Sequence, residues 1–224
     1  MLNSDEYEEM NKSTSELEAS YDRVADQYAD EFFRELERKP SDRALLDAFA
    51  ESVRGRGEVC DIGCGPGHIS RYLQDRGATM RGIDLSREMI KWARGLNPDI
   101  SFAQDNMLAL EVPDASLAAI VCFYAIIHVG RENVARALQE MNRVLQPGGL
   151  LLLSFHGGEG QLHRDVWYDR PISIDLTLFG NDEMRNYLES AGFEVANITE
   201  REPYEFEYPT RRVYALAKKP TGIT

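Results

Sequence analysis

The first helical signal is a repeat of apolar residues at every third or fourth position near the start of the chain. It begins after Ser15, which has the spacing of a capping box with Glu18, and it ends before Pro40. We therefore predict a helix from Ser15, preceded by a loose polar terminus over residues 1–14, and a second helix over residues 41–53. The apolar positions of the first helix are Leu17, Tyr21, Val24, Tyr28, Phe32 and Leu36.

From residue 59 onward, short apolar runs alternate with helical segments. This alternation indicates a doubly wound α/β fold with right-handed crossovers. We place it over residues 55–224, with a flexible terminus and a helical cap over residues 1–54. Residues 156–180 have no periodic pattern and predict a functional loop. Strands are predicted over residues 59–62, 80–84, 100–103, 117–124, 150–155, 193–198 and 212–217, and helices over 68–75, from Ser86 onward, over 132–145 and over 181–191.

Composition narrows the class of protein. The 224 residues are 43% hydrophobic, which is ordinary for a globular domain, and the net charge is −13. No run of Lys and Arg could neutralise phosphates, so nucleic-acid binding is disfavoured. The longest apolar run, residues 117–127, is too short to cross a bilayer, and the acidic N-terminus has no signal-peptide pattern.

The three cysteines add a redox argument. Cys60, Cys64 and Cys122 lie in apolar or Gly-rich surroundings and are typical of reduced, buried thiols. Cys60 and Cys64 lack a second ligand pair, so we expect no metal site. Together with the missing signal peptide, these residues predict a cytoplasmic protein.

The segment D-I-G-C-G-P-G at residues 61–67 is the most informative in the chain. Its glycines let the chain turn off a strand end and let a ligand approach the backbone. The dinucleotide fingerprint G-x-G-x-x-G fails, because its third glycine would fall on His68 and the chain has Gly67 instead. Asp61 would repel a pyrophosphate but suits a cationic or amine-bearing ligand. A glycine-rich turn without a ligand is the alternative.

Acidic residues follow each of the first three predicted strands. They are Asp61, Asp84 and Asp105, and Asp84 lies 17 residues after Gly67. At the tip of the second strand, a carboxylate can bind both hydroxyls of a ribose. One such aspartate is commonly a helix cap, but three at the same sheet edge favour a ligand site.

With these motifs, the sequence resembles the class I S-adenosylmethionine-dependent methyltransferases, and most closely their small-molecule branch. The resemblance covers about residues 15–217 and includes the Tyr-rich segment 21–28. It implies a seven-stranded, mostly parallel sheet in the order 3-2-1-4-5-7-6, with the last strand antiparallel. The motifs that carry it are D-I-G-C-G-P-G (61–67), G-I-D-L-S (82–86), D-N-M (105–107) and R-V-L-Q-P-G-G (143–149).

The resemblance also implies a set of cofactor contacts. The backbone of Gly63, Cys64, Gly65 and Gly67 would pack against the methionine portion of S-adenosylmethionine, with Asp61 supporting its ammonium. The other implied contacts are Asp84 at the ribose, Leu85 and Met89 beside the adenine, Asp105 at the adenine amine with Asn106 and Met107 nearby, and Phe123 and Tyr124 at the sulfonium.

Two tyrosines and a histidine each have two possible roles. Tyr21 and Tyr28 are two helical turns apart and either close over the cofactor as a lid or simply pack the helix onto the domain. His128 follows the fourth strand and is either a base or acceptor ligand, or a structural histidine. The residues considered for an acceptor pocket, or alternatively for a core edge, are His156, His163, Trp167, Tyr168 and Phe179.

The function that follows is methyl transfer from S-adenosylmethionine to a small-molecule acceptor by in-line displacement, giving S-adenosylhomocysteine. A non-catalytic S-adenosylmethionine-binding protein is one alternative. An NAD(P)-dependent oxidoreductase is another, since Tyr214 and Lys218 form a Tyr-x-x-x-Lys match, although on a predicted strand. The identity of the acceptor and the oligomeric state stay open.

Overall fold

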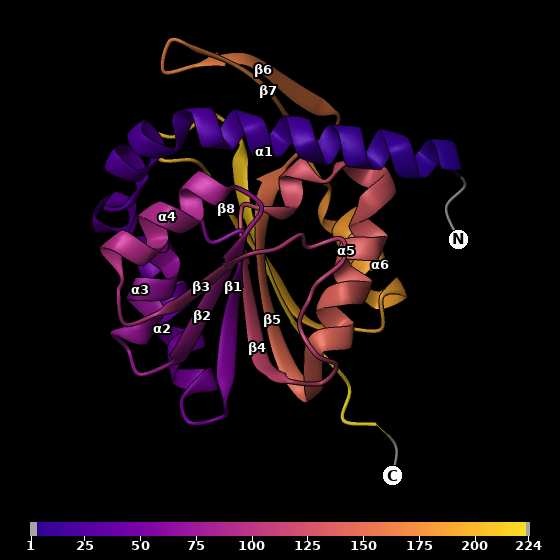
Figure 1. Cartoon of the computed structure of the whole chain (residues 1–224). Helices are drawn as coiled ribbons and strands as arrows, with labels where there is room; N and C mark the ends of the chain where they lie inside the picture. Colours follow the sequence, from indigo (N-terminus) through magenta and orange to yellow (C-terminus); the bar gives the residue numbers. More distant parts are fainter. Residues whose placement is uncertain (1–3, 223–224) are drawn as a thin grey trace.

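A seven-stranded sheet runs through the centre of the protein in the order β3-β2-β1-β4-β5-β9-β8 (Figure 1). The computed structural model describes residues 4–222, with side chains from residue 13 onward. Neighbouring strands are parallel except for β9, which is antiparallel to β5 and β8. Since β8 and β9 are the sixth and seventh strands of this sheet along the chain, the predicted order is confirmed. The strands are β1 (Glu58–Ile62), β2 (Thr79–Asp84), β3 (Ser101–Gln104), β4 (Leu117–Phe123), β5 (Leu145–Gly157), β8 (Glu194–Arg201) and β9 (Arg211–Lys218).

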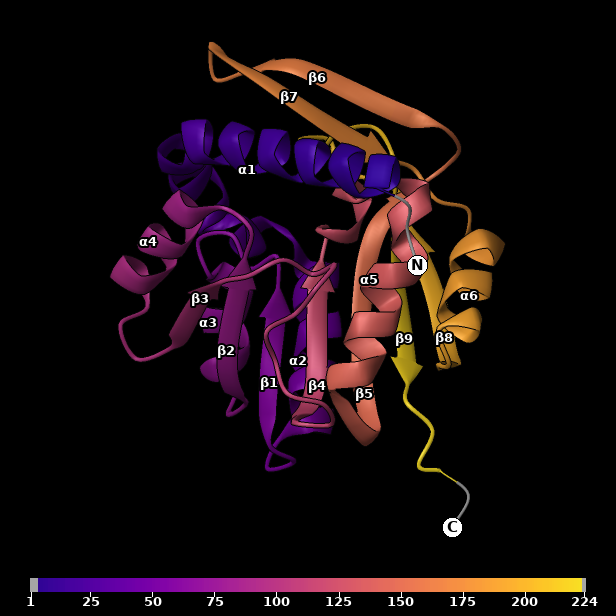
Figure 2. The same ribbon diagram turned by 45° about the vertical axis from the view of Figure 1, so that its right-hand side comes forward.

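Helices cover both faces of this sheet (Figures 1 and 2). On one face α2 (Pro40–Val53), α3 (His68–Gln74) and α4 (Arg87–Leu96) share a buried apolar cluster with the strands. On the other face α5 (Gly130–Val144) and α6 (Asn181–Ser190) do the same. All seven residues of β4 are buried, because its side chains alternate between the two clusters.

The N-terminal helix is longer than its sequence pattern indicates. α1 extends over Ser4–Phe32 and crosses above the carboxyl ends of the strands (Figure 2). The predicted helix start at Ser15 and the loose terminus before it are therefore wrong for residues 4–14, while residues 1–3 lie outside the described chain. Residues with good helix propensity continue upstream of Ser15. The serine therefore lies in the interior of the helix and not at its N-cap position. The helix also ends earlier than predicted, at Phe32 and not just before Pro40. A 3₁₀ turn, η1 (Glu35–Arg38), follows it.

The segment predicted as an unpatterned loop is a β-hairpin. β6 (Gln161–Trp167) and β7 (Arg170–Thr177) pair antiparallel and lie above α1 (Figures 1 and 2). Its turn residues, Tyr168 and Asp169, both have positive φ angles of 52° and 59°. Such a two-residue turn normally carries Asn-Gly or Asp-Gly, so Tyr-Asp gave no hairpin signal.

The hairpin is fastened to α1 rather than to the sheet. Val24, Ile172 and Ile174 form a small buried cluster between the two elements. Arg170 binds the Asp26 carboxylate through both terminal nitrogens, at 2.6 and 2.8 Å. The helix and the hairpin therefore form one layer above the strand ends.

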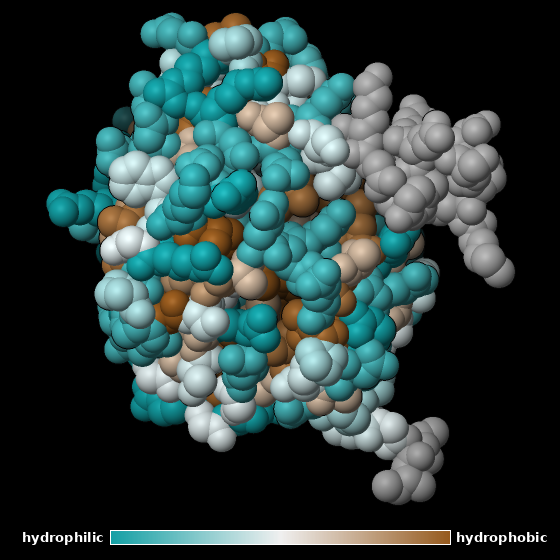
Figure 3. Space-filling view, in the orientation of Figure 1, coloured by the Kyte–Doolittle hydropathy of each residue, from teal (hydrophilic) through white to brown (hydrophobic). Residues whose placement is uncertain are grey.

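The face of the molecule shown in Figure 3 is mostly hydrophilic, with apolar side chains in scattered patches. Among the described helices, none combines the length and apolarity that crossing a membrane requires. Within the described chain, the His, Cys, Asp and Glu side chains form no group of three or more that could hold a metal ion. The three cysteines are buried free thiols.

Candidate functional site

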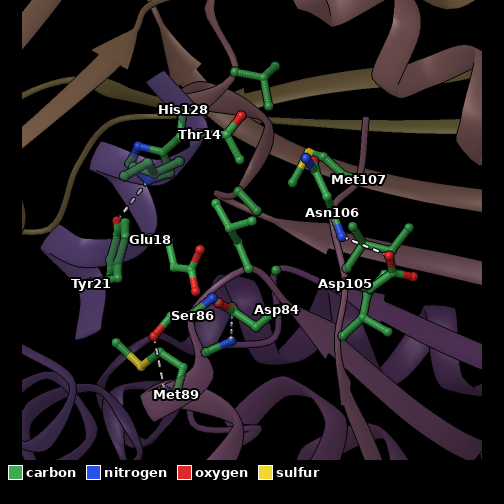
Figure 4. A pocket seen from close by; sticks show the side chains of 18 of the residues that line it. Thr14, Glu18, Tyr21, Asp84, Ser86, Met89, Asp105, Asn106, Met107 and His128 are labelled. Atoms are coloured by element: carbon green, nitrogen blue, oxygen red, sulfur yellow. Dashed lines mark hydrogen bonds between the residues drawn. The ribbon is translucent and has the colours of Figure 1, made fainter. Parts of the chain in front are cut away.

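A cavity of about 110 Å³ lies at the carboxyl ends of the central strands, beneath α1 (Figure 4). Its walls come from α1, the glycine loop, the end of β2, the segment after β3 and the end of β4. Of the residues expected to contact a cofactor, those that line it are Tyr21, Tyr28, Gly63, Gly65, Asp84, Leu85, Met89, Asp105, Asn106, Met107, Phe123 and Tyr124.

The glycine loop presents its backbone to this cavity. Gly63 has a φ angle of 74°, and a Cβ atom placed there would lie 2.2 Å from the Cβ of Ala125. A side chain is therefore excluded both by backbone conformation and by space. The amides of Gly63 and Cys64 donate to the carbonyl of Ile83 at 2.8 and 2.9 Å, which fixes the loop against β2. Cys64 and Gly67 themselves do not line the cavity, since Cys64 is buried and Gly67 packs against Phe102.

Asp84 joins the glycine loop to helix α4. One carboxylate oxygen accepts from the amide of Gly65 and the other from the amide of Ser86, each at 2.8 Å. Ser86 in turn caps α4, as its sequence position predicts, by accepting from the amide of Met89 at 3.1 Å. Burial raises the pKa of Asp84 to about 6. At neutral pH it is a largely ionised carboxylate at the cavity wall, with lone pairs left over after the two backbone bonds.

Asp61 lies behind the cavity wall rather than in it. Its side chain is 1% exposed and accepts a 2.7 Å hydrogen bond from the hydroxyl of Ser70. Burial raises the pKa of this carboxyl to about 6 as well. Asp61 therefore does not line the cavity in this structure, and its support of a ligand ammonium stays a prediction.

The segment after β3 closes the far side of the cavity. Asp105 accepts from the amides of Asn106 at 2.8 Å and Glu111 at 3.0 Å, and burial raises its pKa. Figure 4 shows Asp105, Asn106 and Met107 on one side and Glu18 and Asp84 across from them. Three acids and, among the described lining residues, no Lys or Arg give this cavity a preference for a cationic ligand.

A second, larger cavity of about 620 Å³ adjoins the first. Five residues line both of them and therefore mark the boundary: Tyr21, Tyr28, Phe123, Tyr124 and His128. The larger cavity extends between the β6–β7 hairpin, η1 and β9. Its lining includes His156, His163 and Trp167, three of the residues expected at an acceptor pocket.

The other two expected pocket residues lie elsewhere. Phe179 is fully buried in the core, edge-on to Phe155 and Tyr187, so its assignment to a pocket wall is wrong. Its position after β7 brings it against β5, where it fills space under α6. Tyr168 does not line the cavity; it stacks on Trp167 and donates to Glu31 of α1.

Tyr21 and His128 form a hydrogen-bonded pair at the boundary. The Tyr21 hydroxyl lies 2.8 Å from Nε2 of His128 (Figure 4). Nδ1 of His128 lies 2.9 Å from the carbonyl oxygen of Asp175. A carbonyl can only accept, so Nδ1 carries the proton and Nε2 accepts from Tyr21. Burial lowers the pKa of His128 to about 4 and raises that of Tyr21 above its usual value, so both are neutral at pH 7.

Sequence reasoning missed a group of charged residues on the floor of the larger cavity. Lys39 and Arg212 line it together with Glu35, Glu207 and His68. These residues come from η1 and its flank, from α3 and from the region around β9. Nothing local marks any of them, because the cluster exists only where these segments meet.

The positions of Tyr214 and Lys218 do not fit the Tyr-x-x-x-Lys arrangement of an oxidoreductase. Tyr214 and Lys218 both lie on β9, where residues four apart are separated by about 13 Å. The Tyr214 hydroxyl is instead engaged by Asp42 at 2.8 Å and by Tyr124 at 3.1 Å.

Comparison with known proteins gives a consistent picture. Residues 59–149 match a family model described as a methyltransferase domain. The chain is 31% identical over 119 residues to a malonyl-[acyl-carrier protein] O-methyltransferase of Pectobacterium atrosepticum, covering 53% of this chain and 45% of that protein. It is 30% identical over 152 residues to a probable S-adenosylmethionine-dependent methyltransferase of Mycolicibacterium smegmatis, covering 67% and 57%. The chain thus spans about half the length of these curated relatives.

The fold also matches solved structures. A crystal structure of a S-adenosylmethionine-dependent methyltransferase from Methanosarcina mazei superimposes with a TM-score of 0.70 at 21% identity, over 78% of this chain and 98% of that one. At this level of identity the likeness concerns the fold alone.

Proposed function

We propose that the chain is a class I S-adenosylmethionine-dependent methyltransferase that transfers the methyl group of S-adenosylmethionine to a small-molecule acceptor and releases S-adenosylhomocysteine. The match of residues 59–149 to a methyltransferase domain and the similarity to methyltransferase relatives support this. The observation that carries the proposal is the pair of adjoining cavities. One has the acids and backbone surfaces that suit the cofactor, and the other is large enough for a second ligand. The five residues that line both stand where a methyl group would cross from one ligand to the other.

The residues of the smaller cavity fit the cofactor. Asp84 uses one lone pair of each oxygen on a backbone amide, which leaves further acceptor sites for two ribose hydroxyls. Leu85 and Met89 offer apolar surface for the adenine, and Asp105 offers an acceptor for its amine. When bound, S-adenosylmethionine supplies a methyl group already activated by its sulfonium.

The buried acids fit the positive charge of such a ligand. Asp61 and Asp84 both have a pKa raised to about 6 by burial, so in the unliganded protein their ionised forms are destabilised. A nearby cation stabilises those ionised forms, and by linkage the ionised acids stabilise the bound cation. We therefore assign Asp61 an indirect electrostatic role, in place of the contact expected from the sequence.

The protein's main tasks are then to align the acceptor and to exclude water, which in well-oriented systems contribute roughly 7–11 kcal/mol to lowering a barrier. Tyr21, Tyr28 and Trp167 form an aromatic wall, with ring centroids 5.5 Å apart for Tyr28 and Trp167 and 5.9 Å apart for Tyr21 and Tyr28. This wall is anchored by α1 and the hairpin, and it covers the boundary between the cavities.

His128 is better suited to positioning than to deprotonation. With a pKa of about 4 it is a weak base that stays neutral at pH 7, with its one proton on Nδ1, and its Nε2 already accepts from Tyr21. We propose that the pair holds the Tyr21 hydroxyl and ring in place at the boundary. The acceptor then has to be nucleophilic without help from this histidine.

Calorimetric titration followed by a transfer assay tests the proposal. We expect one S-adenosylhomocysteine bound per chain and no binding of NADH. With S-adenosylmethionine carrying an isotopically labelled methyl group, label should then pass to a component of a small-metabolite extract. Absence of S-adenosylhomocysteine binding would contradict the cofactor assignment, and binding without transfer to any extract would favour a non-catalytic binding protein.

A further inference from the structure

Arg212 is a buried cation whose ion pair with Glu207 is long, at 3.6 Å. Its residue is 4% exposed, and it lines the larger cavity. Nη1 donates to the backbone and side-chain oxygens of Thr210, and Nε lies 3.6 Å from a carboxylate oxygen of Glu207. Among the described residues, none accepts a hydrogen bond from Nη2. This guanidinium is therefore only partly satisfied by the protein.

The neighbouring carboxylates are bound more closely to other cations. Glu207 receives two hydrogen bonds from Arg201, at 2.6 and 3.0 Å, and lies 3.2 Å from Lys39. Asp42 pairs with Arg201 at 2.7 Å, and Glu35 pairs with Lys39 at 2.7 Å. Each of these carboxylates therefore has a closer cation than Arg212, so the guanidinium of Arg212 is the least tightly paired cation of this group and the one best able to bind a ligand.

The two cavities also differ in the charge of their linings, and this difference favours an anionic ligand in the larger one. The smaller cavity has Glu18, Asp84 and Asp105 and no basic partner among its described lining residues. The larger one has more Lys and Arg than Asp and Glu in its lining, although the chain as a whole carries a charge of −13. Its basic lining residues are Arg34, Arg38, Lys39, Arg164 and Arg212, and its acidic ones are Glu31, Glu35, Glu37 and Glu207.

We propose that the acceptor carries a carboxylate, which pairs with Arg212, on an apolar body held by the aromatic walls of the larger cavity. This inference rests on the proposed function, since it names the class of molecule that the second cavity takes. Phe206 and Tyr208 line the cavity and are 44% and 48% exposed, which leaves apolar surface available to such a body. The guanidinium carbon of Arg212 lies 5.8 Å from the ring centre of Tyr124, a boundary residue, so the bound carboxylate would lie near the methyl donor.

A carboxylate fits this site better than a phosphate. A guanidinium edge matches the plane and the two oxygens of a carboxylate. A phosphate monoester is close to a dianion at neutral pH, and the two other cations of the cluster, Lys39 and Arg201, are each already paired with two carboxylates.

The test compares two probes of equal shape, 3-phenylpropanoate and 3-phenylpropanamide, titrated into the full-length protein loaded with S-adenosylhomocysteine. We expect the carboxylate to bind at least about tenfold more tightly than the amide, because only the carboxylate forms a hydrogen bond between two charged groups with the buried guanidinium. In Arg212→Gln the preference should fall below about threefold. The matched control is Arg211→Gln, since Arg211 is the next residue on β9, is exposed, pairs with Glu200 and does not line the cavity. It should keep the preference.

Several results would overturn the inference. These are equal affinity for the two probes in the natural protein, an undiminished preference in Arg212→Gln, or displacement of the carboxylate by an equal concentration of inorganic phosphate. If Arg212→Gln does not fold, Arg212→Lys serves instead, with an expected partial loss of the preference, and an undiminished preference again overturns the assignment. Failure of S-adenosylhomocysteine to bind would contradict the proposed function, whereas the probe comparison on the unliganded protein still decides the carboxylate site.

Discussion

Replacing Asp84 by asparagine tests the cofactor site at its most connected residue. The natural carboxylate accepts from two amides at once, those of Gly65 and Ser86, each at 2.8 Å. An asparagine offers one oxygen, so its NH₂ group must face the second amide donor. The variant keeps the shape of the side chain but loses one hydrogen bond to the loop and the negative charge toward the ribose.

The expected loss of affinity follows from the hydrogen bonds to charged groups. Each such bond contributes about 1.5–3 kcal/mol, so S-adenosylhomocysteine should bind roughly 10- to 100-fold more weakly to Asp84→Asn. Calorimetric titration at pH 8 measures this. The control is Asp114→Asn, a change at an exposed carboxylate that pairs with Arg143 away from the cavity, which should leave the affinity unchanged.

The same variant has a pH signature in the unliganded protein. Burial raises the pKa of Asp84 from 3.8 to about 6. Well below pH 3.8 the group is protonated in both the folded and unfolded states and contributes nothing. As the pH rises the unfolded state ionises first, so ionisation destabilises the fold, by on the order of 3 kcal/mol above pH 6. Asparagine has no such cost.

Urea unfolding at pH 5 and pH 8 measures that difference. About half of the penalty is already present at pH 5, so the free energy of unfolding of the natural protein should fall by about 1.5 kcal/mol relative to Asp84→Asn between these two values. Unchanged affinity for S-adenosylhomocysteine would refute the ribose assignment. A difference in stability that does not vary with pH would refute the argument from burial.

Three other changes probe the layer above the strand ends. Tyr21→Phe leaves Nε2 of His128 without its hydrogen bond and should lower the free energy of unfolding by about 1–2 kcal/mol in urea titrations; an equal stability would mean the bond contributes nothing. Burial lowers the pKa of His128 to about 4, so the plot of log kcat against pH should have no inflection between pH 6 and 8 that is due to this residue. An inflection in that range that disappears in His128→Gln would show that His128 acts as a base. Asp26→Asn breaks the pair with Arg170, so trypsin should cleave the hairpin about two- to fivefold faster, and equal rates would show that the pair does not hold it.

Much of the fold could be predicted because the burial of a strand or helix face produces a pattern of apolar residues within a short segment of the sequence. The fully apolar β4 segment, the 3.6-residue period of α5 and the Gly-rich turn after β1 each reflect constraints on neighbouring residues. Strand-end acids such as Asp84 and Asp105 were found for a related reason. Once the sheet is known to be parallel, its carboxyl ends must lie at one edge, so sequence position gives spatial position.

The errors occurred where the deciding contacts are distant in sequence. The hairpin was missed because β6 is largely exposed and its Tyr168–Asp169 turn lacks glycine. Phe179 was assigned to a pocket because nothing near it in the chain shows that α6 and β5 enclose it.

The sequence by itself therefore determined the sheet, the glycine loop and the acids of the smaller cavity, since each depends on a short segment and on the direction of its strand. Only the tertiary structure decided that Tyr21 meets His128, 107 residues away, and that Asp61 lies behind the wall. It also decided that Arg212 is a buried cation whose neighbouring carboxylate, Glu207, lies closer to Arg201 than to Arg212. The physical reason is that hydrogen bonds and ion pairs depend on distances in space, and segments far apart in the chain leave no local pattern when they come together.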